Sequence, residues 1–279
     1  MAEIKWFGHA CVRVRGRDVT VLMDPVPPGT PWACGAVSTV QFTGTPLYHL
    51  LDQAHVRPSA HETLFQGADQ GEVAPGRVVP FARSLPLAVA RHPHTLLAWA
   101  MNDQPLTAEH GFPLRLVVPG WYGMASVKWL ARVSLLPGPF RGYFQQERYV
   151  YVQERGTPDN TPVTRMRVRA IMARPAQGAR LKLGPVEVAG TAWSGEGPIA
   201  RVEVSTDGGA TWSQARLGRA YSEYAATPWS FLWTPPRPGT YTLVARATDA
   251  AGNLQPLESR WNTYGYGNNV VQWVRVTVG

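Results

Sequence analysis

Cysteine is scarce in this chain: only Cys11 and Cys34 occur among 279 residues. Two cysteines cannot build a disulfide framework or a four-cysteine zinc site, so both classes are excluded. No apolar run reaches the length of a membrane-spanning helix, and the first 25 residues lack the apolar core of a signal peptide. The sequence therefore predicts a cytoplasmic protein without a membrane partner.

Acidic residues are also few, with 19 Asp and Glu against 27 Lys and Arg. The basic surplus is dispersed and no long basic run occurs, so a nucleic-acid partner is not expected. A formal net charge of +8 still suits a site for an anionic small molecule or an acidic protein. The 25 Pro and 27 Gly indicate short strands and turned loops rather than long helices.

The first 25 residues carry a hairpin pattern. "CVRVRG" and "VTVLMD" alternate apolar and other residues around a Gly-Arg-Asp turn. This stretch resembles the start of metallo-β-lactamase-fold hydrolases. The H-x-H-x-D-H metal motif of those enzymes is absent, and "HPH" at 92–94 continues without Asp or His. We therefore interpret His9 and Cys11 as packing residues of a hairpin rather than as metal ligands.

The rest of the chain changes its periodicity along its length. "TPLYHLLDQAHV" and "LPLAVARH" have helical spacing, whereas "TLLAWAM" and "RLVVP" indicate buried strands. Near the end the period is two, with about seven strands and a "TDGG" hairpin loop, which predicts an immunoglobulin-like sandwich. The expected divisions are a hairpin segment 1–28, an α+β domain 29–137, a linker 138–160 and a sandwich 161–279.

One stretch stands out by its charge. Residues 110–130, "HGFPLRLVVPGWYGMASVKWL", contain three candidate cations and no carboxylate, and we call this stretch the basic hinge. The cations are His110, Arg115 and Lys128. Burying unpaired charge is unfavourable, so the hinge either turns these groups to water or binds an anion. Solvated loop charges and an anion site both remain open from the residues alone.

From residue 30 onward the chain contains a series of distinctive sequence motifs, each present once. They include, in order, "WACGAV", "FQGAD", "SLPLAVA", "LLAWAMNDQPLTAEHGFPLRLVVPGWYGMASVKWLARV", "GTAWSGEGPIARVEVSTDGGATW" and "WNTYGYGNN". These motifs resemble the sulfite oxidase family of molybdenum enzymes. The resemblance implies an α+β fold: a partial molybdopterin-binding domain, then an immunoglobulin-like domain that forms a homodimer. It implies Mo-molybdopterin as cofactor, whose phosphate, amino and carbonyl groups would be contacted by Asp69, His110, Arg115, Ser126, Val127 and Lys128.

The sequence departs from the family pattern at two places. The family binds molybdenum through a cysteine in a "CAGN"-like context upstream of "WACGAV", and this chain lacks that context, so we expect a truncated relative. Cys34 is the remaining candidate metal ligand, although the family does not place its ligand there. Phe81 stands where the family carries a tyrosine at the substrate pocket, so we assign no catalytic residue.

The resemblance implies molybdopterin-dependent oxygen-atom transfer to sulfite or a related small oxyanion or sulfoxide. Electrons would pass to a separate cytochrome or another acceptor, because no C-x-x-C-H haem site occurs here. Loss of the cysteine region is expected to impair turnover. The alternatives are a non-catalytic dimeric remnant and a pterin-binding protein without turnover.

Overall fold

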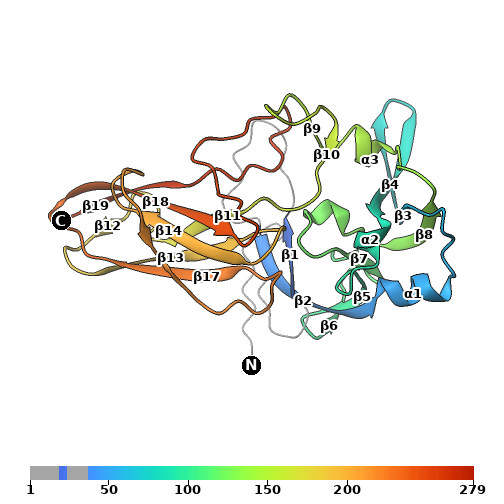
Figure 1. Ribbon diagram of the computed structural model, residues 1–279, viewed down its shortest axis with the longest axis horizontal. Coiled ribbons are helices and arrows are strands. Elements are labelled where there is room, and N and C mark those ends of the chain that lie inside the picture. Colours follow the sequence, from blue (N-terminus) through green and yellow to red (C-terminus); the bar gives the residue numbers. More distant parts are fainter. Residues whose placement is uncertain (1–18, 24–36) are drawn as a thin grey trace. The chain divides into compact units, whose positions relative to one another are not determined.

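The chain forms two compact units in the computed structural model, which describes residues 19–23 and 37–279 (Figure 1). The first unit contains the described residues up to Thr164 and the later segment Trp261–Tyr266. The second unit contains Arg165–Arg260 and Gly267–Gly279. Most of the expected hairpin, and both cysteines, lie outside the described residues. Every helix in the described ranges is too short or too polar to span a bilayer.

The first unit is built on two antiparallel sheets. One has the order β1-β2-β5-β6, with β7 also paired to β5, and the other has the order β4-β3-β8. Their strands are β1 (Val19–Met23), β2 (Val37–Pro46), β5 (Leu96–Met101), β6 (Gln104–Pro105), β7 (Arg115–Val117), β3 (Glu62–Ala74), β4 (Arg77–Pro86) and β8 (Leu130–Leu136). The β1 strand lies antiparallel to β2, with Val19 opposite Gln41.

The helices of this unit are short, as the Pro and Gly content predicts. They are α1 (Leu47–Gln53), α2 (Leu87–Ala90), α3 (Tyr143–Gln146) and the 3-10 turn η1 (Gly123–Ala125). The hydrophobic core draws on both sheets and on α1: Leu47 and Leu51 pack with Phe65 of β3 and Leu97 of β5. The expected helices and strands of this region are thus confirmed, with shorter bounds.

The segment expected to be a linker, residues 138–160, is folded with the first unit. It contains α3 and β9 (Val150–Tyr151), and β9 pairs with β10 (Thr161–Pro162). Val150 is fully buried. The later segment Trp261–Tyr266 returns to the same unit, where Thr263 N–H donates to Val152 O at 2.9 Å.

The second unit is a β-sandwich, which confirms the fold class. One sheet contains β11 (Arg169–Arg174), β13 (Val186–Trp193), β17 (Thr227–Trp233) and β16 (Arg216–Leu217) in that order. The other contains β12 (Arg180–Leu181), β19 (Trp273–Val278), β18 (Gly239–Asp249), β14 (Ile199–Ser205) and β15 (Ser213–Gln214) in that order. Trp229 and Trp233 lie in its core, whereas Trp273 is 49% exposed.

Candidate cofactor-binding site

The basic hinge folds back on itself. Leu116 N–H donates to Val127 O at 2.8 Å, and Leu130 N–H donates to Leu114 O at 2.8 Å. These bonds lay the end of the hinge along β7, with η1 in the turn between them. Arg115 and Lys128, which are separated in the sequence, therefore lie close together in the fold.

Arg115 is buried and works as a clamp between the two arms of the hinge. Its guanidinium donates to His110 O at 3.0 Å and to Ser126 O at 3.1 Å, and it lies 5.3 Å from the centre of the Phe42 ring. Arginine suits this role because its planar fork carries five N–H donors and keeps its charge when buried. The sequence predicted a direct cofactor contact here, and these bonds add a structural role.

Ser126 and Val127 are buried, and their polar groups are already used within the hinge. The Ser126 hydroxyl accepts from Val118 N–H at 3.0 Å. The backbone N–H groups of Ser126 and Val127 donate to Gly123 O at 3.0 Å and Ala125 O at 3.2 Å. The Val127 side chain lies in the hydrophobic core. These two residues therefore shape the loop, and direct contact with a cofactor remains a proposal for both.

Lys128 has more hydrogen-bonding groups left for a ligand than Ser126 and Val127 have. Its ammonium donates to Glu109 O at 3.1 Å and lies 4.4 Å from the centre of the Trp129 ring. An ammonium has three N–H groups, and described residues accept from one of them. Gly111 (φ +98°) permits the close approach here, because a Cβ at that position would lie 3.0 Å from Lys128 Cβ. Lys128 is thus placed to bind an anion.

His110 lies beside these cations and is held by Thr107, whose hydroxyl is 2.8 Å from Nδ1. Burial lowers the pKa of His110, and the positive charges of Arg115 and Lys128 lower it further, while Glu109 raises it. The imidazole is therefore neutral near pH 7. With Nδ1 engaged by Thr107, Nε2 is the nitrogen available to a ligand.

Asp69 lies next to the hinge on a β-bulge, where the β3–β4 register shifts between Gln66 and Gln70. Its Oδ1 is buried and has no hydrogen-bond partner among the described residues. Gly67 makes room for it, since a Cβ there would lie 2.2 Å from Asp69 Oδ1 and 2.9 Å from Lys128 O. A buried acceptor without a donor is unfavourable unless a ligand supplies one.

Burial raises the pKa of Asp69, and its own backbone N–H and Lys128 partly offset that effect. A carboxyl with a raised folded-state pKa stabilises the protein at acid pH, and that stabilisation is lost as the pH rises through the folded pKa. We expect Asp69→Asn to raise the unfolding free energy of the cofactor-free protein at pH 7, by less than about 1 kcal/mol. The gain in unfolding free energy should shrink towards zero as the pH falls.

Urea unfolding of the wild type and Asp69→Asn, from pH 7 down into acid, measures this difference in unfolding free energy. Asp103→Asn, at an exposed position, is the control. A destabilised Asp69→Asn protein at pH 7 would mean that the carboxylate has an internal structural partner.

Phe81 of β4 is half-buried, and its ring centre lies 4.7 Å from that of Phe144. Two residues along, Arg83 is 1% exposed and donates to Phe144 O and, at 2.9 Å, to Val163 O. Burial lowers the pKa of Arg83 to about 10, and its Nε lacks a partner among the described residues. Sequence reasoning missed Arg83, although a single Arg between Ala82 and Leu85 of an apolar strand was a signal.

The described residues contain no group of three or more His, Cys, Asp or Glu side chains placed to bind a metal. The rings of His92 and His94 lie 5.6 Å apart, without a third ligand in the described ranges. Cys34, the candidate ligand from the sequence, lies outside the described residues. The structure brings His110, Arg115, Lys128 and Asp69 together, and we call these four residues the hinge cradle.

Comparison with known proteins assigns both units. Residues 6–144 match the family model described as an oxidoreductase molybdopterin binding domain, and residues 160–279 match a Mo-co oxidoreductase dimerisation domain. The first match begins at residue 6 and so runs through the segment that we compared with hydrolases. It also contains every residue of the hinge cradle.

Three relatives illustrate the match. The chain is 35% identical to human mitochondrial sulfite oxidase over 90% of its own length and 48% of that protein. It is 32% identical to Arabidopsis thaliana sulfite oxidase, over 89% of this chain and 69% of that protein. The sulfane dehydrogenase SoxCD of Paracoccus pantotrophus superposes with a TM-score of 0.79 and 28% identity, over 92% of this chain and 68% of that one. The chain spans about half the length of its animal relatives. It belongs to the sulfite oxidase family.

Proposed function

We propose that the hinge cradle binds a molybdopterin, and that the chain serves oxygen-atom transfer to sulfite or a related small oxyanion or sulfoxide. The observation that carries this proposal is that two polar groups of the cradle have hydrogen-bonding capacity left for a ligand. Asp69 offers a buried acceptor that has no donor among the described residues, and Lys128, whose charge lowers the pKa of Asp69, offers ammonium N–H groups. A pterin carries N–H donors for the first group and a phosphate for the second.

The residues of the cradle would have separate tasks. Asp69 would accept from the pterin amino group, Lys128 would neutralise the phosphate, and neutral His110 would donate or accept at Nε2. Arg115 would keep the two arms of the hinge at the spacing that the cofactor needs. When bound, the molybdenum cofactor would supply the oxygen-atom transfer and would accept the electrons that the oxidised substrate gives up.

The remaining parts of the proposal concern organisation. We place the cofactor domain in the first unit, which includes residues 138–160, and the dimerisation domain at 161–279, through which the chain would form a homodimer. The electron acceptor would be a separate cytochrome or another protein. The match of residues 160–279 to a dimerisation domain supports the homodimer.

A pterin-binding protein without turnover is a second candidate, favoured by Phe81. Its ring packs against Phe144 and has no hydroxyl to offer a substrate. Removal of one such donor typically lowers turnover by about 10²–10³-fold. We therefore expect sulfite-dependent dye reduction near background, and a rise of about tenfold or more in Phe81→Tyr with unchanged pterin content.

Pterin content and dye reduction are measured on the same preparations. Bound pterin without turnover in either protein would assign the chain to the second candidate. Absence of pterin from both would reject the proposed function altogether.

A further inference from the structure

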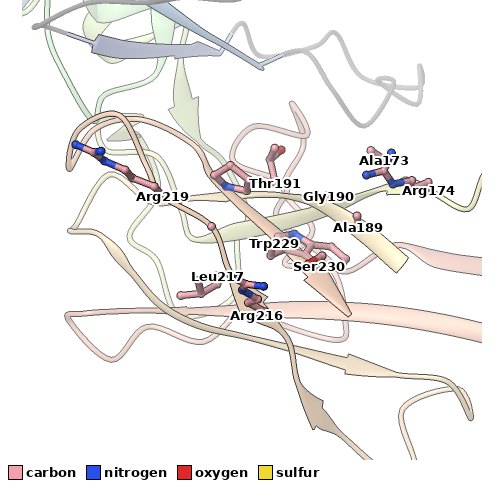
Figure 2. A pocket seen from close by; sticks show the side chains of 12 residues that line it. Ala173, Arg174, Ala189, Gly190, Thr191, Arg216, Leu217, Arg219, Trp229 and Ser230 are labelled. Atoms are coloured by element: carbon pink, nitrogen blue, oxygen red, sulfur yellow. The ribbon is translucent and has the colours of Figure 1, made fainter. Parts of the chain in front are cut away.

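The solvent-facing side of the β11-β13-β17-β16 sheet contains a groove of about 780 Å³ (Figure 2). Its floor includes the small side chains of Ala189, Thr191 and Ser230, together with Pro228. Three arginines also line it: Arg174, Arg216 and Arg219. A groove forms here because small residues occupy the middle strands, whereas long side chains stand on the two outer ones.

The strand register explains the spacing of these charges. Arg174 lies opposite Ala189, Ala189 opposite Ser230, and Ser230 opposite Arg216. This row crosses four strands, so three inter-strand spacings of roughly 4.8 Å separate the two arginines at its ends, about 14 Å in all. Figure 2 shows Arg174 and Arg219 at opposite ends of the groove.

The positive charges of the groove are mostly unbalanced. Arg174 pairs with Glu187 at 2.8 Å, but both side chains are more than half exposed, so this pair exchanges readily with another anion. Arg216 and Arg219 make no ion pair with any described residue. The groove is therefore an open, electropositive surface with a floor of small and hydroxyl-bearing residues.

We propose that this groove binds an acidic peptide segment of a partner protein. An extended peptide advances about 3.3 Å per residue, so carboxylates four residues apart would reach both ends of the arginine row. Arg219 would take a third carboxylate, and the Thr191 and Ser230 hydroxyls could hydrogen-bond the peptide backbone. The proposal is independent of the function proposed for the hinge cradle.

Other occupants fit the groove less well. A second copy of this chain would bring the same positive charges to the contact. A single small oxyanion cannot reach arginines that stand at opposite ends of the groove. A single-stranded nucleic acid would be expected to stack on exposed aromatic rings, whereas Trp229, the only aromatic residue among the described residues that line the groove, is 2% exposed.

The test uses the full chain and a fluorescent peptide with glutamates at every fourth position, compared with the same peptide carrying glutamines. We expect anisotropy to report binding of the glutamate peptide alone, weakening as salt screens the charges. The double variant Arg216→Glu, Arg219→Glu should lower the affinity by about tenfold or more. The control is the double variant Arg180→Glu, Arg201→Glu, which makes the same charge changes on the other sheet. It should change the affinity for the peptide by less than about twofold.

Equal losses in the two double variants would show diffuse attraction to a basic protein and overturn the proposal. Full displacement of the peptide by inorganic phosphate at the same ionic strength would assign the groove to a small anion instead. Sedimentation of both variants completes the experiment: a change in dimerisation confined to the groove variant would make a second copy the occupant, and would likewise contradict the proposal.

Discussion

Replacing Arg115 by alanine is expected to lower the unfolding free energy of the first unit by about 2–4 kcal/mol and to abolish pterin binding. The substitution leaves His110 O and Ser126 O without the buried guanidinium that joins them. It also opens a cavity beside Phe42, whose ring faces that group.

The control is Arg57→Ala, which removes an equal charge from an exposed position and should cost less than about 0.5 kcal/mol. Urea unfolding followed by tryptophan fluorescence gives the stabilities, and fluorescence of the released, oxidised pterin gives the cofactor content. Equal stability of the two variants would refute the clamp role of Arg115.

Replacing Arg83 by methionine is expected to cost about 2–4 kcal/mol of unfolding free energy, because Phe144 O and Val163 O lose a buried donor. Methionine keeps much of the side-chain volume, so the loss reports the hydrogen bonds rather than a cavity. Arg77→Met, on the same strand, removes an exposed pair with Glu147 and should cost less than about 1 kcal/mol.

The two variants are compared by urea unfolding of the purified full chain. A neutral or stabilising Arg83→Met would mean that the free-energy cost of burying this charge equals or exceeds what its two carbonyl partners return, and that the segment 144–163 is held in place without the Arg83 bonds.

Local patterns were enough to predict much of the fold. Helical spacing placed α1, and the period-two region placed the sandwich strands, because both patterns follow from burial of one face. The "TDGG" loop was predictable since Gly208 and Gly209 have positive φ, which most residues avoid. The folded structure of residues 138–160 was not predictable, because it depends on distant partners such as Arg83, and the position of Arg83 in an apolar strand does not show which carbonyl groups it binds.

The candidate site was predictable in residue type but not in role. The absence of acids from the basic hinge left an anion site and solvated loop charges both open, and the structure brings the backbone of Lys128 near Asp69, on either side of Gly67. The burial of Arg115 depends on the path of the folded hinge, so a clamp could not be distinguished from a ligand contact in the sequence. The Asp69 bulge depends on a β3–β4 register that the sequence does not specify.

The most direct test of the central claim, that the hinge cradle binds a pterin phosphate, is a titration of cofactor-free protein with isolated molybdopterin. Lys128→Gln removes one charge-assisted contact while Arg115 keeps the hinge in place, so its Kd should rise about tenfold or more over the wild type. Arg57→Gln, which removes an equal charge from an exposed loop, should bind within about twofold of the wild type. If Lys128→Gln binds as tightly as Arg57→Gln, the hinge cations are solvated loop charges and the cradle is not the cofactor site.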